Sequence, residues 1–257
     1  MKAGAAKMRL DLLLTVRGLV SSRERARALI LAGRVLVCEQ KVDKPGTAIP
    51  SDAPVRLLGE DQPYVSRGGL KLAAALDHWG IAVSGRVCLD VGASTGGFTD
   101  CLLQRGAAQV TALDTGFGQI AMELRNDLRV RLLERTNARL LQPGSLVGGA
   151  GGPEITFLAM DVSFISATLL LGPVLAAAPS LREAVILVKP QFEAGREHVG
   201  KGGIVRDPAA HELAIERVAH CVRSLGWEVS GTIPSPITGV EGNKEFLLYA
   251  KGAGALE

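Results

Sequence analysis

A glycine-rich turn between an apolar strand and a helix-compatible segment constrains the fold of this chain more than any other feature. The apolar residues 87–91 run into the turn 92–97, and residues 98–105 then have helical character. Three glycines in this turn remove the Cβ atoms that would keep backbone N–H groups away from a ligand. Since a corner that only joins a strand to a helix does not need three glycines, the turn predicts a ligand-binding site.

A carboxylate, Asp114, ends the next apolar strand, 22 residues after Gly92. Rossmann-like folds hold a nucleoside ribose with an acidic residue about 20 positions past the glycine turn. The turn departs from the dinucleotide fingerprint G-x-G-x-x-G because Ser94 stands where the middle glycine would be. Its form, D-x-G-x-x-x-G-G-F-[ST] from Asp90, resembles the S-adenosylmethionine (SAM) turn of class I methyltransferases, in which Asp90 would lie close to the methionine ammonium. The pattern favours SAM over NAD.

Seven residues at or after strand ends are expected to contact this cofactor. They are Asp90, Gly92, Ser94, Gly96, Gly97, Asp114 and Asn137. Asn137 follows the third strand and suits the adenine edge, although it serves equally well as a turn residue.

Strands and helices alternate through the rest of the chain, which predicts an α/β fold with a doubly wound, mainly parallel seven-stranded sheet. The expected strands are 87–91, 109–114, 129–134, 155–160, 184–189, 227–233 and 245–250. Helical patterns cover 70–79, 163–177 and 208–225. Ligands of such a sheet bind at the carboxyl ends of its strands.

Composition narrows the class of protein further. The four cysteines form no C-x-x-C pair, so they indicate a reducing cytoplasm rather than a disulfide framework or a metal site. No apolar run approaches the roughly 18 residues that a membrane span requires, and the N-terminus lacks the apolar core of a signal peptide. We therefore expect a cytoplasmic protein with no membrane or metal partner. No pattern specifies an oligomeric state.

Positive charge gathers in the N-terminal part. Residues 1–71 hold 13 Lys/Arg and 7 Asp/Glu, whereas residues 72–257 hold 16 and 19, so the net charges are +6 and −3. This asymmetry predicts contact with a polyanion such as RNA, mainly through phosphates, because aromatic residues are few here. The expected RNA-binding residues are Arg9, Arg17, Arg23, Arg27, Arg34 and Arg67. Arginines that only solvate a helix are the alternative.

Two short helices and a hairpin are expected in this part. The helices cover 8–14 and 21–31; the second begins with a capping box, Ser21 with Glu24, and ends at Gly33. Strands over 34–37 and 55–58 flank a Pro/Gly-rich loop, 45–54. The motifs R-L-D-x-L-L and A-x-x-L-I-x-x-G-x-V-x-V resemble the alpha-L RNA-binding motif of a small-subunit ribosomal protein. We expect an α+β RNA-binding domain over 8–60, a linker over 61–69 and a methyltransferase domain over 70–251.

Four charged residues stand at predicted strand ends or beside the linker: Lys71, Asp161, Lys189 and Glu245. Singly, each could be a surface charge, and Asp161 could cap the helix expected at 163. Together, at the ligand-binding edge of one sheet, they predict a catalytic group. The motif [DNS]-P-P-[YF] of amino-group methyltransferases is absent, and no cysteine stands near the fourth strand as cytosine C5 enzymes require. These observations favour transfer to an oxygen.

Nearly the whole chain resembles the TlyA family, and more loosely the FtsJ-type ribose methyltransferases. The segments that carry the resemblance are 65–72, the SAM turn, 160–166, 188–193 and 200–205. The resemblance implies SAM-dependent 2′-O-methylation of a cytidine in ribosomal RNA, with ribosomal RNA or subunits as partners. It also implies a Lys71–Asp161–Lys189–Glu245 catalytic tetrad. A membrane-active haemolysin and an RNA-binding protein with an inactive methyltransferase fold are the alternatives.

A ribose hydroxyl is a weak acid, so its methylation needs a base or strong electrostatic help. Lys189 is the expected base, with Lys71 as a second positive charge, yet neighbouring carboxylates favour a charged lysine that stabilises an alkoxide instead. Both roles remain open. The glycine-rich residues 191–207 form an expected lid that contacts RNA.

Overall fold

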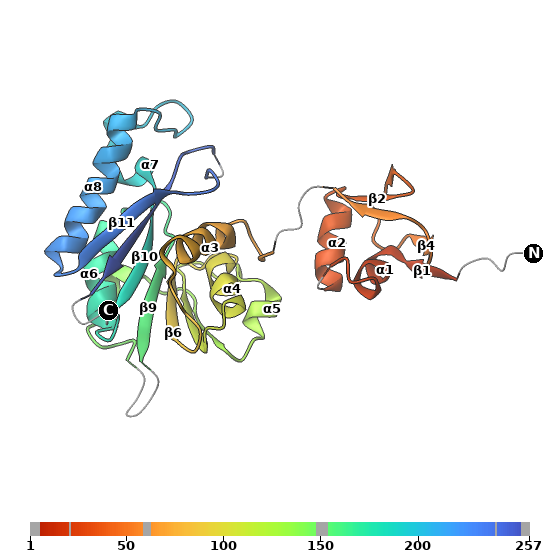
Figure 1. The fold of residues 1–257 in the computed structure, drawn as a ribbon, viewed down its shortest axis with the longest axis horizontal. Helices are drawn as coiled ribbons and strands as arrows, with labels where there is room; N and C mark the ends of the chain where they lie inside the picture. Colours follow the sequence, from red (N-terminus) through yellow and green to blue (C-terminus); the bar gives the residue numbers. More distant parts are fainter. Residues whose placement is uncertain (1–5, 21, 59–62, 148–153, 240, 253–257) are drawn as a thin grey trace, which may run out of the picture. The chain divides into compact units, whose positions relative to one another are not determined.

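The computed structural model describes residues 6–20, 22–58, 63–147, 154–239 and 241–252. Contacts within the chain divide it into two compact units, Met1–Gln62 and Pro63–Glu257 (Figure 1). The predicted linker extended to residue 69, but residues 63–69 lie in the second unit. Tyr64 is buried in the core of that unit, and the Val65 N–H donates to Asp100 Oδ2 at 2.8 Å. Residues 61 and 62 lie outside the described residues.

The first unit combines two packed helices with short antiparallel strands. The helices are α1 (Leu10–Val16) and α2 (Arg23–Leu31). One sheet has the order β3–β2–β5, from Gln40–Lys41, Val35–Val37 and Val55–Leu57, and β1 (Lys7–Arg9) pairs with β4 (Ala48–Pro50). Met8 pairs with Ile49, so this pairing replaces the expected start of the first helix and part of the expected loop 45–54.

The ends of α2 show how local sequence defines a helix. Ser22 is the N-cap, because its side chain accepts a hydrogen bond from the Arg25 N–H at 3.1 Å. The predicted capping box of Ser21 with Glu24 is therefore wrong, and Ser21 itself lies outside the described residues. Gly33 ends the helix as predicted, with a φ of 65° that only glycine adopts without strain.

The second unit is built on a seven-stranded sheet in the order β11–β12–β10–β9–β6–β7–β8. Its strands are β6 (Val87–Val91), β7 (Gln109–Leu113), β8 (Val130–Leu133), β9 (Ile155–Met160), β10 (Glu183–Val188), β11 (Glu228–Pro234) and β12 (Phe246–Lys251). Strand β12 runs antiparallel to both of its neighbours, and all other pairs are parallel. The predicted mainly parallel sheet is confirmed.

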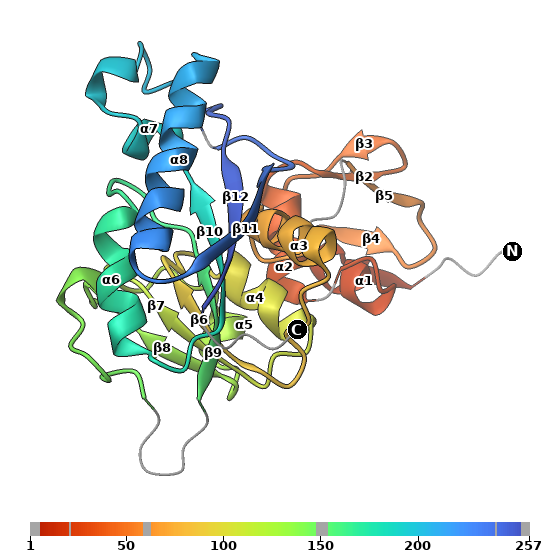
Figure 2. The ribbon, with the colours of Figure 1, turned by 60° about the vertical axis from the view of Figure 1, so that its left-hand side comes forward.

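Helices cover both faces of this sheet and bury two apolar cores (Figures 1 and 2). On one face lie α3 (Gly68–Trp79), α4 (Gly97–Gln104) and the short α5 (Met122–Arg125). On the other lie α6 (Thr168–Ala177) and α8 (Pro208–Ser224), and the single turn α7 (Pro190–Glu193) follows β10. This layering leaves the carboxyl ends of β6, β7, β9 and β10 together at one edge.

Helix α6 is shorter than predicted. It begins at Thr168 rather than at 163, because residues 161–167 follow an irregular path in which Phe164 has a φ of 65°. Asp161 is therefore no helix cap; the N-cap position of α6 is Ala167.

Candidate active site

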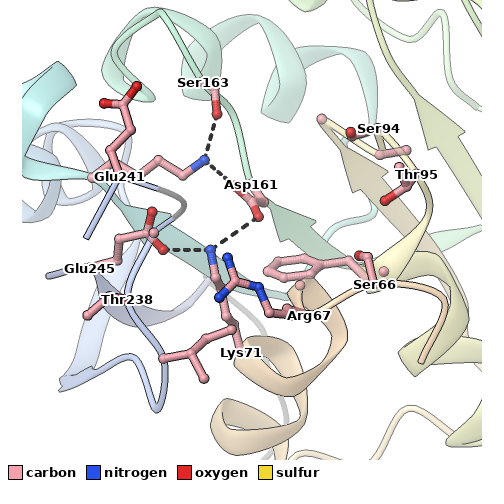
Figure 3. Close-up of a pocket in the computed structure, with 18 of the residues that line it drawn as sticks. Ser66, Arg67, Lys71, Ser94, Thr95, Asp161, Ser163, Thr238, Glu241 and Glu245 are labelled. Atoms are coloured by element: carbon pink, nitrogen blue, oxygen red, sulfur yellow. Dashed lines mark hydrogen bonds and ion pairs between the residues drawn. The ribbon is translucent and has the colours of Figure 1, made fainter. Parts of the chain in front are cut away.

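Two lysines and two carboxylates meet at the carboxyl edge of the sheet. Lys71 comes from α3, Asp161 follows β9, Lys189 follows β10 and Glu245 precedes β12. Lys71 Nζ lies 2.6 Å from Glu245 Oε2 and 4.0 Å from Asp161 Oδ2 (Figure 3). Lys189 Nζ lies 2.6 Å from Asp161 Oδ1. The structure thus brings together all four residues predicted for the catalytic tetrad, in one alternating chain of charges.

Three of these four side chains are almost removed from solvent, and that of Asp161 is 19% exposed. Lys71 and Lys189 are each 8% exposed and Glu245 is 4% exposed. Charges this buried are expensive unless they are paired, and here each ammonium contacts at least one carboxylate. Such a pre-paired, partly dry group can stabilise charge that develops on a reacting oxygen.

The tetrad opens into a cavity of about 540 Å³. The cavity is bounded by the glycine turn, by α3 and its N-terminal approach, and by the segment before β12. Arg67 lines it next to Lys71, as Figure 3 shows. The predicted RNA-binding residue Arg67 therefore lines the first cavity of the second unit.

A second cavity of about 420 Å³ adjoins the first along a common wall. The wall residues shared by both cavities are Gly92, Ser94, Asp161, Ser163 and Phe164. Both Asp114 and Asn137 line the second cavity. Asp114 accepts backbone hydrogen bonds from Ser94 N at 2.8 Å and Gly116 N at 2.6 Å. Its carboxylate keeps further lone pairs for a ligand hydroxyl.

Asn137 also plays the structural part that its sequence position allowed. Its side chain caps the 3₁₀ turn Ala138–Leu140 by accepting a hydrogen bond from the Arg139 N–H at 3.0 Å. Asn137 therefore both caps this turn and lines the second cavity.

The three turn glycines each have a packing reason that the sequence did not reveal. A Cβ on Gly92 would lie 2.1 Å from the carbonyl oxygen of Asp161, and one on Gly97 would lie 2.3 Å from Ser66 Oγ. Gly96 packs against Leu124 and lines neither cavity. Neighbouring segments therefore pack closely against the turn 92–97, so its glycines are needed for packing as well as for access of a ligand.

Asp90 is fully buried at the end of β6 and lines neither cavity. Its Oδ2 accepts a hydrogen bond from Thr99 Oγ1 at 2.7 Å, while its Oδ1 has no hydrogen-bond partner among the residues that the structure describes. Burial raises the pKa of this carboxyl to about 7. An unpaired oxygen on a carboxyl that lines neither cavity is a cost in stability rather than a contact for a ligand.

In the first unit, four of the five predicted arginines are held by their own unit. Arg9 and Arg23 both bond to the buried Asp11, at 2.9 and 3.1 Å, and these partners lower the pKa of that carboxyl to about 2. Arg17 donates to the carbonyls of Ser51 and Ala53, and Arg34 donates to that of Leu58. The side chain of Arg27 is exposed.

Two residues near the tetrad, Ser163 and Glu193, were not predicted from the sequence. Ser163 Oγ accepts a hydrogen bond from Lys189 Nζ at 2.7 Å. Glu193 accepts from Ser166 Oγ at 2.5 Å and from the Ala167 N–H at 2.7 Å. Both lie inside the segments 160–166 and 188–193 that carried the family resemblance, so the signal was present without a role attached to it.

The predicted lid, 191–207, begins inside α7 and contains the short turn Arg196–His198. Gln191 and Phe192 line the first cavity. Further along, the buried Asn243 bonds to the backbone of Gly203 and Val205, each at 2.9 Å. These two hydrogen bonds attach the loop to Asn243, two residues before Glu245.

Comparison with protein-family models finds two matches. The FtsJ-like methyltransferase model matches residues 64–252, and the S4 domain model matches residues 8–53. Among the residues that the structure describes, no helix combines the length and apolar character needed to cross a membrane.

Similar proteins cover nearly the whole chain. It is 47% identical over 243 residues to "Putative rRNA methyltransferase YqxC" of Bacillus subtilis, which spans 95% of this chain and 85% of that protein. It is 44% identical over 248 residues to "16S/23S rRNA (cytidine-2'-O)-methyltransferase TlyA" of Mycobacterium tuberculosis, spanning 96% and 91%. The solved structure "Putative hemolysin from Streptococcus thermophilus" matches with a TM-score of 0.71 and 42% identity, over 97% of this chain and 90% of that one.

Proposed function

Because this chain belongs to the TlyA family, in which an S4 domain precedes an FtsJ-like methyltransferase domain, we propose that it methylates the 2′-oxygen of a cytidine in ribosomal RNA. The observation that carries this proposal is the tetrad, whose four charged side chains converge beside two adjoining cavities. A ribosomal substrate would also place the protein in the cytoplasm.

SAM fits the second cavity and its surroundings. Asp114 offers a carboxylate to a ribose and Asn137 an amide to an adenine edge. Asp90, predicted to lie close to the methionine ammonium, is fully buried and lines neither cavity, so it supports the turn from beneath. Gly92 and Ser94 connect this cavity to the catalytic one. When bound, SAM supplies a methyl group made electrophilic by its sulfonium charge.

The tetrad then acts on the ribose. Lys189 contacts the 2′-hydroxyl, and its amine is held in place by Asp161 and by Ser163. Lys71, paired with Glu245, adds the second positive charge at the same edge. The 2′-hydroxyl proton passes either to Lys189, if its amine is neutral, or to solvent. In the second case the charged Lys189 stabilises the negative oxygen, and in both cases Lys71 adds positive charge.

The N-terminal unit binds RNA in this proposal. Arg9 and Arg23, gathered around Asp11, and the exposed Arg27 present guanidinium groups to phosphates. Structured RNA is recognised chiefly by shape and backbone, which suits a folded ribosomal subunit as substrate.

The decisive experiment incubates the protein with labelled SAM and purified small or large ribosomal subunits, then locates the methyl group by mass spectrometry of nuclease fragments. We expect a methyl on a cytidine ribose, lost in Lys189→Ala and in Asp161→Ala. SAM affinity measured by calorimetry stays nearly unchanged in Lys189→Ala, because Lys189 does not line the second cavity. A methyl on a base, or full activity of Lys189→Ala, would overturn the proposal.

One variant separates the two roles of Lys189. Arginine stays protonated at any working pH, so Lys189→Arg can supply positive charge but cannot act as a base. Measurable turnover by Lys189→Arg above that of Lys189→Ala indicates electrostatic stabilisation; no difference between the two indicates a base.

A further inference from the structure

The segment from Asp161 to Ala167 carries two residues of the site but has no regular structure to hold it. It joins β9 to α6, and it contains the positive-φ residue Phe164. Its start is tied to the sheet by a hydrogen bond from the Asp161 N–H to the Val91 carbonyl, at 3.0 Å. The position of Asp161 and Ser163 therefore depends on side-chain contacts further along the segment.

Those contacts come from one short turn that begins with Lys189. At one end of the turn, Lys189 Nζ reaches Asp161 and Ser163. At the other end, four residues later, Glu193 reaches Ser166 Oγ and the Ala167 N–H. Between them Phe192 packs against Phe164, with ring centroids 5.6 Å apart. The turn 189–193 thus contacts the segment 161–167 near both ends of that segment.

The side chain of Glu193 lies in the protein interior and does not face either cavity. It is 2% exposed and lines neither cavity, and its two carboxylate oxygens are spent on Ser166 and Ala167. Arg217 of α8 donates a hydrogen bond to the backbone carbonyl of Glu193, which attaches the turn to α8. No regular N-cap side chain serves α6, so Glu193 supplies the acceptor from outside the helix.

We infer that Glu193 is a positioning residue for methyl transfer: by holding Ser166 and Ala167, it sets the placement of Asp161 and Ser163 around the Lys189 amine. This inference rests on the proposed function for its effect on turnover. Displacing a reacting group by about 1 Å costs on the order of 100-fold in rate, because orientation contributes so much to catalysis. SAM affinity changes far less than turnover, because Asp114 and Asn137, which hold the nucleoside in the proposed function, lie outside this segment.

Three variants of the full-length protein test this. Glu193→Ala removes both contacts, and we expect kcat to fall about 100-fold with the KM for SAM within about twofold. Glu193→Gln keeps the shape: its amide oxygen accepts from Ala167 N and its amide nitrogen donates to Ser166 Oγ, so kcat is restored. Glu183→Ala is the control, since Glu183 also accepts two hydrogen bonds, from Arg86 and Tyr249, but at the amino end of β10. It lowers the melting temperature without lowering kcat.

A second readout needs neither RNA nor turnover. Acetic anhydride labels Lys189 at a rate that depends on its surroundings, and peptide mass spectrometry follows this rate against the exposed Lys201. We expect a several-fold change in Lys189 labelling in Glu193→Ala and none in Glu193→Gln or Glu183→Ala. Unchanged labelling in Glu193→Ala overturns the inference, as does unchanged kcat. If the unaltered protein methylates no RNA, the proposed function fails, and the labelling still decides the positional role.

Discussion

Asp90 provides a direct test of the electrostatics beneath the SAM turn. Its carboxyl group is fully buried with Thr99 as its single hydrogen-bond partner, and burial is the largest cause that raises its pKa from 3.8 to about 7. The nearby charges of Asp161 and Asp114 raise it further. Replacement of Asp90 by Asn removes the titration and keeps an oxygen that accepts from Thr99.

The sign of the effect follows from the proton balance. Between pH 4 and 7 the folded protein keeps a proton on Asp90 that the unfolded chain has released. The stability contributed by this group is therefore fully present below pH 4 and is lost as the pH rises to 7. A shift of about three units corresponds to about 4 kcal/mol in total, of which roughly 3 kcal/mol is lost between pH 5 and pH 8.

Urea unfolding at pH 5 and pH 8 measures this loss. The two tryptophans, Trp79 and Trp227, both belong to the second unit, so their fluorescence reports on that unit within the full chain. We expect Asp90→Asn to gain about 3 kcal/mol relative to the wild type on going from pH 5 to pH 8. Asp77→Asn, which removes a carboxylate whose pKa Arg105 lowers, shows no such gain. Equal differences at both pH values would refute the reasoning, because Asp90 would then be ionised throughout.

Three further predictions address the turn, the second cavity and the first unit. Asp114→Ala weakens SAM binding by about tenfold in calorimetry, because a ribose hydroxyl loses a charged acceptor worth about 1.5 kcal/mol; unchanged affinity argues against the assigned cavity. Gly92→Ala places a methyl group 2.1 Å from the Asp161 carbonyl oxygen, so both the melting temperature and the rate of methyl transfer fall. A normal rate of methyl transfer would show that the backbone at Asp161 can move to make room for the methyl group. Arg17→Ala lowers the thermal stability of the first unit through two lost backbone contacts, whereas Arg27→Ala lowers only RNA affinity; the reverse pattern would exchange their roles.

The sheet and the tetrad were predictable because strand ends are a local property of the sequence. Each of Asp161, Lys189 and Glu245 directly follows or precedes an apolar strand, and parallel strands bring their carboxyl ends to one edge. Knowing the strands therefore placed the charges near one another. Their pairing distances required the structure.

Contacts between distant segments were not predictable in this way. Met8 leaves the expected helix because it pairs with Ile49, some 40 residues away. Glu193, after β10, binds Ser166, which lies 27 residues earlier after β9, and nothing in the local sequence of either marks the other as its partner. The packing role of Gly92 likewise depends on the carbonyl of Asp161, which follows β9.

The wall shared by the two cavities has a consequence for inhibitor chemistry. Gly92, Ser94 and Asp161 face both cavities, so an adenosine-like group in one and a ribonucleoside-like group in the other would be separated by a single layer of residues. A short covalent tether between two such groups makes the second binding event intramolecular, at an effective concentration in the millimolar range. A tethered bisubstrate compound would therefore exceed the affinity of either half without any new contact.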